Sequence, residues 1–523
     1  MSSFFKGVAL LVALCCLVWV GMLWHWQTAQ HDMSVRDVVV YLGALPLTLF
    51  ALVLLGGWAW RGAAAKAELQ TKPPQAPAAA AHAPTEDEAA RHATWQLLAA
   101  HGNTVMGTTP AEWLEAAAAQ KPLPAIDPEL RDAQGLPAIT ARVPGVDPAA
   151  IDDEVDALLQ ALQPQHPELQ LSRALRRALA LLRDPLGAAV AALAPWAAAL
   201  QVAPPKPPPG AARAATGPAA PVLAQSRIGV LAAWPAALNA LELALAEQWL
   251  MNQCAAAGEG IVATARWSLV MAPGGAAADT ATPALSGPQW WQRADVWFER
   301  QRRDQTQAPL LLLATHSDID ADALDRLQSA APIFSSGQPK GTVPGEAAVA
   351  LLLAPAAWPR DPQADADVHL PHLHRAAVAL RDKSIDAPGR HTHALTPQLM
   401  AQALAAARLT KDDIGAVVND ADQHTARGAE LFAALQGELP QLDPVEDMRM
   451  VGSLCGDIGA CATLLTVALA AHQATKLGKP CLALSLRDAH WRAALVARPA
   501  APPAPPAPAA PAAPAAPAAP ASS

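Results

Sequence analysis

Residues 341–353, GTVPGEAAVALLL, and residues 452–462, GSLCGDIGACA, decide the fold of this chain. In the first stretch a Pro-Gly turn precedes a seven-residue apolar run, Ala347 to Leu353, which has the length and boundaries of a buried strand. In the second, small residues let a helix begin tightly against a strand, and Leu464 to Ala471 predicts a mostly buried helix. Each stretch alone also fits an ordinary strand or helix of another α/β protein.

The surrounding sequence extends this pattern into a layered α/β domain at residues 222–496. Helices are expected at residues 239–253, 288–303 and 396–407. Between them, apolar runs predict strands near residues 228–232, 267–271, 309–314, 345–353, 414–419 and 480–486.

In this order the two stretches resemble the β-ketoacyl synthases and other thiolase-fold condensing enzymes. That family has a PGE-containing strand after the first half of its fold and a GHxxGAAG turn that opens a core helix of the second half. The resemblance implies a thiolase-like layered α/β domain. It also shows departures: the histidine of the second motif is Asp457 here, and a carboxylate would repel the enolate charge that imidazole stabilises.

The other positions implied by the resemblance also depart from the family pattern. The first catalytic histidine position falls near Asn419 or Asp420, with His424 several residues further along, whereas Glu430 can stand for the closing acid. The helix at 288–303, where the nucleophile belongs, contains no cysteine, and Cys254 closes a helix instead of opening one.

Aromatic residues repeat on one face of the 288–303 helix: Trp290, Trp297 and Phe298. They are core residues or, in a sharper reading, they fill what would be an acyl pocket. Either reading predicts that the chain is not an enzyme, so no catalytic, cofactor-binding or metal-binding residue is assigned and no cofactor is expected. The rival reading is an atypical thiolase-fold condensing enzyme that acts on acyl thioesters.

Five histidines lie close together in the sequence. Alternation along a strand would put His372 and His374 on one face as a metal pair, but no acid or cysteine at ligand spacing supports a metal. Surface or core positions are therefore expected for the group, which consists of His369, His372, His374, His391 and His393.

The amino-terminal residues 1–62 predict a transmembrane hairpin. Val8 to Trp26 and Val38 to Trp60 are long enough to cross a bilayer as helices and contain no Asp, Glu, Lys or Arg. A cleavable signal peptide is the competing reading of the first span. Basic residues flank the outer ends of the hairpin, which predicts an inner-membrane protein of bacteria with its soluble domains in the cytoplasm.

Composition excludes one class of partner and divides the rest of the chain. A net charge of −9 without a basic cluster makes nucleic acid an unexpected partner. The four cysteines outside the hairpin show no disulfide framework, which agrees with a reducing compartment. Pro/Ala-rich segments predict linkers at 73–90 and 203–221 and a disordered tail at 499–523.

Residues 91–202 are expected to form a small α+β module. A helix is expected to start at residues 95–98, with further helices at 151–162 and 171–182 and a strand at 137–143.

The whole plan is similar to the type VI secretion lipase adaptor proteins. The resemblance rests on the two-span amino terminus, the GNTVMG stretch at 102–107 with Trp113, and the degenerate thiolase-like domain. It implies a non-catalytic, membrane-anchored adaptor that binds a phospholipase effector in the cytoplasm and assists its loading on the secretion machinery, with secretion spike components as further partners. A membrane scaffold that uses the domain only to dimerise is a third reading.

Overall fold

The computed structural model describes residues 86–164, 171–202, 227–270, 286–361 and 370–499, apart from residues 237, 305, 307, 331 and 336. Both predicted membrane spans, the 203–221 linker and the tail from residue 500 lie outside these residues. In the described part of the chain, no single helix is long and apolar enough to cross a bilayer, and one bent pair of helices (173–191 and 194–200) meets this test by length and composition only.

Two halves of the chain repeat one strand pattern. In the first half β4 pairs in parallel with β5 and β6, and β6 pairs antiparallel with β7. In the second half β10 pairs in parallel with β11 and β12, and β12 pairs antiparallel with β13. The bounds are β4 Ile228–Ala233, β5 Trp267–Leu269, β6 Leu310–Ser317, β7 Glu346–Pro355, β10 Ala416–Asn419, β11 Met448–Met450, β12 Cys481–Ser485 and β13 Trp491–Arg498.

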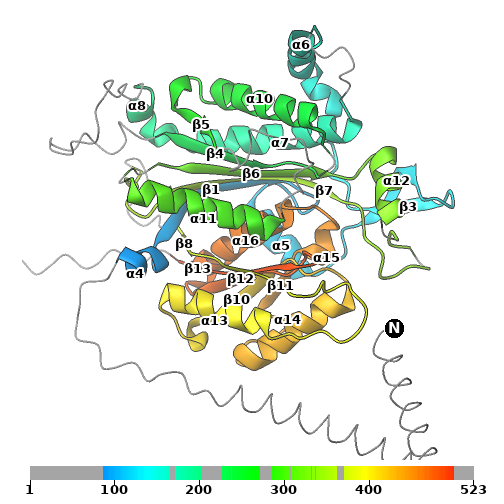
Figure 1. The fold of residues 1–523 in the computed structure, drawn as a ribbon, viewed down its shortest axis with the longest axis vertical. Helices are drawn as coiled ribbons and strands as arrows, with labels where there is room; N and C mark the ends of the chain where they lie inside the picture. The colour runs from blue at the N-terminus through cyan, green and yellow to red at the C-terminus, as the bar shows by residue number, and fades with distance from the viewer. Residues whose placement is uncertain are drawn as a thin grey trace, which may run out of the picture. The chain divides into compact units, whose positions relative to one another are not determined.

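These strands confirm the six that the sequence predicts, and helices complete five layers (Figure 1). Helices α7 and α10 cover the outer face of the first half, and α13 and α14 cover that of the second. Helices α5, α11 and α16 lie between the halves, where they share one apolar core with the inner faces of the strands. The bounds are α5 Pro110–Ala119, α7 Arg173–Ala191, α10 Ala240–Ala257, α11 Gly287–Arg303, α13 Leu395–Ala407, α14 Thr425–Glu438 and α16 Cys461–Leu477.

The helix expected to start at Trp95 is wrong, because this segment is strand β1, Thr94–Asn103. It pairs antiparallel with β7 on one side and with β8 (His372–His374) on the other. Since β8 also pairs with β13, β1 joins both halves into one path of strands. Burial explains the difference: the Trp95 ring stacks on Phe298 of α11 with 4.0 Å between ring centroids, and this tertiary contact overrides local helix preference.

Strand β1 and helices α5 and α7 are therefore built into the same sheet and cores as the thiolase-like region. Helix α7 packs against β1, β6 and β7, and its long apolar face belongs to the outer core of the first half. The GNTVMG turn and Trp113 lie together, since the Trp113 Nε1 donates to the Gly107 carbonyl oxygen at 2.9 Å. The strand expected at 137–143 is β3, and the helix expected at 151–162 is α6. The bounds of the remaining elements are α4 Glu86–Arg91, β2 Ala125–Arg131, β3 Pro137–Thr140, α6 Asp152–Leu162, α8 Ala197–Leu200, α12 Ala321–Ala330, β9 Ala377–Leu380 and α15 Gly452–Cys455.

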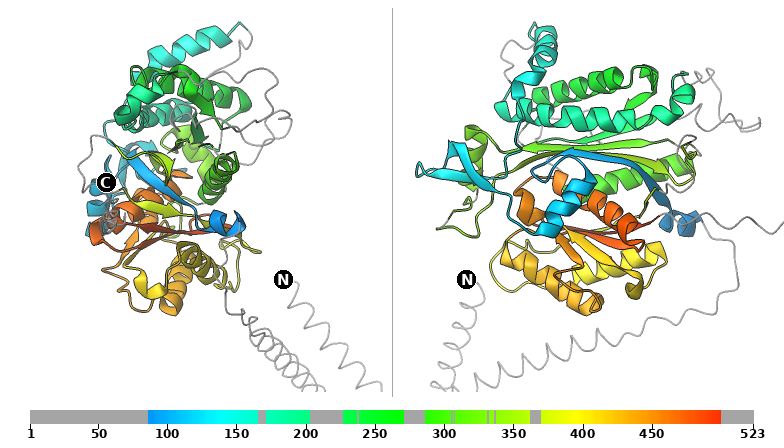
Figure 2. Two further views of the ribbon diagram at one scale, coloured as in Figure 1. Left: turned by 90° about the vertical axis from the view of Figure 1, so that its left-hand side faces the viewer. Right: turned by 180° about the vertical axis from the view of Figure 1, so that it is seen from behind.

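The β2–β3 hairpin extends from the side of these layers, next to α12 (Figures 1 and 2). A small apolar cluster that includes Leu130, Ala138 and Leu324 joins the hairpin to α12.

Candidate functional site

A cavity of about 980 Å³ opens at the carboxyl ends of β10 and β12. Its lining comes from the β10–α14 loop and the start of α14, from the β9–α13 loop, from the segment before β7, and from Asp457 and Arg487. In α/β folds the carboxyl ends of parallel strands meet at one edge, where ligands commonly bind. This cavity is therefore the candidate functional site.

The charged groups of the cavity lining are four Lys or Arg side chains and three Asp side chains. Arg427 pairs with Asp386 at 2.9 Å and Arg487 with Asp457 at 3.4 Å. Lys340 and Arg390 line the cavity without an ion pair to any residue described by the structure. His391, His393 and His424 add three imidazoles. The arrangement favours a ligand with at least one negative charge.

His424 lies immediately before α14, at the end of the loop that follows β10. Its Nδ1 lies 3.0 Å from Asp422 Oδ1, and the same oxygen accepts the backbone N–H of His424 at 3.0 Å. Burial opposes ionisation of Asp422, but the neighbouring His424, Arg487 and Arg427 hold the pKa of this carboxyl well below its usual range. A buried carboxylate thus lies at ion-pair distance from an imidazole that lines the cavity, although the Nδ1 of His424 makes no hydrogen bond to any described residue.

Asn419 and Asp420, where the resemblance places a catalytic histidine, are buried anchors between strand ends. Asp420 accepts hydrogen bonds from Ser485 Oγ at 2.6 Å and from the backbone N–H of Arg487 at 3.0 Å, while burial raises its pKa. Asn419 accepts the N–H of Ala421 and donates to the Arg449 carbonyl oxygen. These bonds fix the loops that carry His424 and Arg487.

Asp457 lines the cavity and links the two halves of the fold electrostatically. Burial works against its charge, but Arg487 and His316 lower its pKa. His316 lies near the carboxyl end of β6, and its Nε2 is 2.8 Å from Asp318 Oδ2. Its pKa is raised because Asp318 and Asp457 outweigh the opposing effect of burial. The sequence prediction missed His316, although the polar residues that end this buried strand signal such a position.

The first turn of α11 packs so closely against α16 that it leaves no room for a side chain at Gly287. A Cβ atom added to Gly287 would lie 2.0 Å from Thr463 Oγ1 of α16, so no side chain fits there without a shift. The expected helix 288–303 is α11, and Phe298 is buried while Trp290 and Trp297 pack against the same core. The four cysteines described in the structure are all buried. Burial raises the pKa of both Cys254 and Cys455 to about 12.

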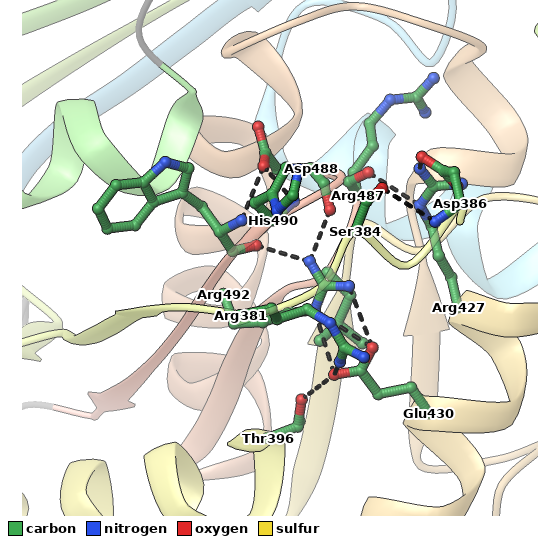
Figure 3. Close-up of polar contacts among 12 residues, drawn as sticks. Arg381, Ser384, Asp386, Thr396, Arg427, Glu430, Arg487, Asp488, His490 and Arg492 are labelled. Carbon is green, nitrogen blue, oxygen red and sulfur yellow. Dashed lines mark hydrogen bonds and ion pairs between the residues drawn. The ribbon is translucent and has the colours of Figure 1, made fainter. Parts of the chain in front are cut away.

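Glu430, the expected closing acid, lies in a buried ion-pair cluster and not in the cavity lining (Figure 3). It accepts hydrogen bonds from Arg381 Nη1 at 2.8 Å, Arg492 Nη2 at 3.1 Å and Thr396 Oγ1 at 2.6 Å. Glu346 plays a comparable part at the start of β7: it accepts the N–H of Val143 at 2.8 Å and pairs with the guanidinium of Arg177. Both acids tie separate segments together.

The five clustered histidines separate in space. His391 and His393 line the cavity, His372 and His374 lie on β8, and His369 is outside the described residues. Within the described ranges, no three His, Cys, Asp or Glu side chains lie close enough to hold a metal ion.

No protein-family model and no curated protein matches the chain. Solved structures do match. A β-ketoacyl synthase from Burkholderia phymatum aligns over 78% of this chain and 100% of its own, with a TM-score of 0.50 and 12% identity. The ishigamide ketosynthase/chain length factor aligns over the same shares with a TM-score of 0.47 and 16% identity. At these identities the similarity shows the fold, which is thiolase-like α/β.

The prediction that the chain is not an enzyme is contradicted by this comparison. It rested on three positions, at Asp457, at Asn419–Asp420 and in the 288–303 helix, whereas the structure matches a β-ketoacyl synthase and so has a condensing-enzyme fold. The prediction also took no account of the cavity in which His424, His391 and His393 come together.

Proposed function

We propose that the chain is an atypical thiolase-fold condensing enzyme that acts on acyl thioesters in the cavity beside His424. The observation that carries the proposal is this imidazole, which lies 3.0 Å from the ionised Asp422 and faces a cavity of about 980 Å³. The fold, shared with a β-ketoacyl synthase, supports the same class of reaction. Lys340 and Arg390 suit the negative charge of a thioester carrier.

In the proposed reaction His424 removes a proton from the carbon next to the carbonyl of one thioester. The resulting carbanion attacks the carbonyl carbon of a second acyl thioester, a C–C bond forms and the C–S bond of that thioester breaks. The leaving thiolate takes the proton back from His424, and Asp422 stabilises the imidazolium between these steps. Because the described cysteines are buried, the acyl group passes directly between the two thioesters.

The test measures release of free coenzyme A by the full chain from pairs of acyl-CoA thioesters, one of them acetyl-CoA. His424→Gln should lower the rate at least about 100-fold, because general acid–base catalysis contributes that much or more. His490→Gln is the matched control, since His490 is exposed and outside the cavity lining, and it should leave the rate unchanged. Equal rates in both variants, or no release from any pair, would refute the proposal.

The lipase-adaptor role stays a prediction. Its implied partners, a phospholipase effector and secretion spike components, can be sought with the full chain as bait, and the lipase should be retained without acyl thioester if the role is correct.

A further inference from the structure

Arg427 lines the cavity and contacts three separate loops of its wall. It belongs to the first turn of α14 and is 6% exposed. Its Nε donates to the Arg487 carbonyl oxygen at 2.8 Å and its Nη2 to Asp386 Oδ2 at 2.9 Å (Figure 3). Its Nη1 lies 3.5 Å from Asp422 Oδ2.

Asp422 is thereby held between a guanidinium and an imidazole. One carboxylate oxygen, Oδ2, faces Arg427, and the other, Oδ1, lies beside the Nδ1 of His424. The planar fork of Arg427 directs two hydrogen bonds at fixed angles and keeps Nη1 at ion-pair distance from Asp422, an arrangement that the single ammonium of lysine cannot reproduce. Arg427 thus fixes Asp422 and, at the same time, the walls on either side of His424.

We propose that Arg427 is a positioning residue for His424, which acts by holding Asp422 against the imidazole and by locking the β9–α13 and β12–β13 loops to the start of α14. This inference rests on the proposed function for the catalytic part of His424. The arrangement of Arg427, Asp422 and His424 itself can be tested without any substrate.

The test follows the ionisation of His424 by NMR in the full chain labelled with [¹⁵N]histidine, with the signal assigned through His424→Gln. Arg427→Lys keeps the positive charge and removes the fork. If Arg427 holds Asp422 in place, the titration midpoint of His424 should fall by roughly 0.5 pH unit or more, because the imidazolium loses its nearest carboxylate. Asp422→Asn should lower the midpoint further, and Arg427→Lys should add little in that background.

Other charged groups around His424 stay the same in this comparison. They are Arg487 and Asp457 behind the loop, Asp386 on the β9–α13 loop, and Lys340, Arg390, His391 and His393 along the cavity. Arg390→Lys is the matched control, since Arg390 is an exposed cavity arginine without an ion pair to any described residue, and it should leave the midpoint unchanged.

A His424 midpoint in Arg427→Lys within about 0.2 pH unit of the parent protein would overturn the inference. If Arg427→Lys does not fold, Asp386→Asn removes one of the three anchors at a half-exposed residue. It should shift the midpoint in the same direction by a smaller amount, and an unchanged midpoint there would also overturn the inference. In the thioester assay Arg427→Lys should lower kcat at least about 10-fold with little change in KM. A shifted midpoint without any turnover would retain the positioning role and refute the proposed function alone.

Discussion

Buried charged side chains join separate segments in the second half of this fold. Glu430 meets Arg381 and Arg492, both of them buried, and its pKa is lowered because these guanidinium groups and Thr396 outweigh the opposing effect of burial. Since the folded-state pKa is depressed, this contribution to stability is present at neutral pH and is lost as the pH falls below about 4.5.

Glu430→Gln should destabilise the protein by about 3–5 kcal/mol at pH 7, because it leaves two buried guanidinium groups without a counter-charge. Urea unfolding followed by circular dichroism measures the change. Glu446→Gln, at an exposed acid, should alter the unfolding free energy by less than about 0.5 kcal/mol. A similar stability for both variants would show that the cluster contributes little.

Asp295 has the opposite pH dependence. Burial in α11 raises its pKa to about 7, although Arg375 and the indole N–H of Trp95 favour the charged form. A raised folded-state pKa gives stability that is present below the unfolded value near 4 and is lost as the pH rises to about 7.

In the parent protein, the free energy of unfolding should therefore fall by up to about 4 kcal/mol between pH 4 and pH 7. Asp295→Asn should remove this decline. Denaturant titrations at several pH values, with the exposed Asp325→Asn as control, measure this slope. An unchanged slope in Asp295→Asn would mean that the carboxyl is ionised throughout this range.

At the level of elements, the sequence predicts those strands whose apolar runs are buried on both faces. Strands β6, β7 and β12 fall where expected because their runs are bounded by turn residues. Strand β1 was read as a helix, since TWQLLAA has no strict alternation and its partners, β7 and β8, lie about 250 residues or more away in the sequence. Local pattern cannot report such a distant pairing.

The sequence also predicted only part of the candidate site. The resemblance located the segments around Asn419–Asp420, Glu430 and Asp457. The structure brings Asn419, Asp420 and Asp457 to the ends of β10 and β12, whereas Glu430 lies in the buried cluster with Arg381 and Arg492. Lys340 and Arg390 come from other loops with no motif of their own, so only the fold reveals that they share a cavity with His424.

Strand β1 gives a prediction about the length of chain needed for folding. A chain that begins at Pro84 retains the whole compact unit and should unfold cooperatively. A chain that begins at Thr104 lacks β1 and exposes the edges of β7 and β8 together with part of the central core, so it should be insoluble or molten. Circular dichroism melts compare the two, and cooperative unfolding of the shorter chain would contradict this role of β1.

On the scale of the whole molecule, two similar halves place α11 and α16 against each other at the centre of the fold. In this chain that centre is closed by Gly287 and Thr463, and the cavity lies at the carboxyl ends of strands of the second half. In the proposed reaction the reactive group is accordingly the imidazole of His424 on a loop, and not a thiolate at the start of a helix.

The most direct measurement of this account is the mass of the product that the full chain forms from an acyl-CoA and ¹³C-labelled acetyl-CoA. The account predicts a β-ketoacyl thioester that contains carbon from both substrates, no such product with His424→Gln, and no acyl group on the protein, because the pKa values of Cys254 and Cys455 near 12 leave them protonated at neutral pH. The absence of this product, or an acyl group attached to a cysteine, would contradict the account.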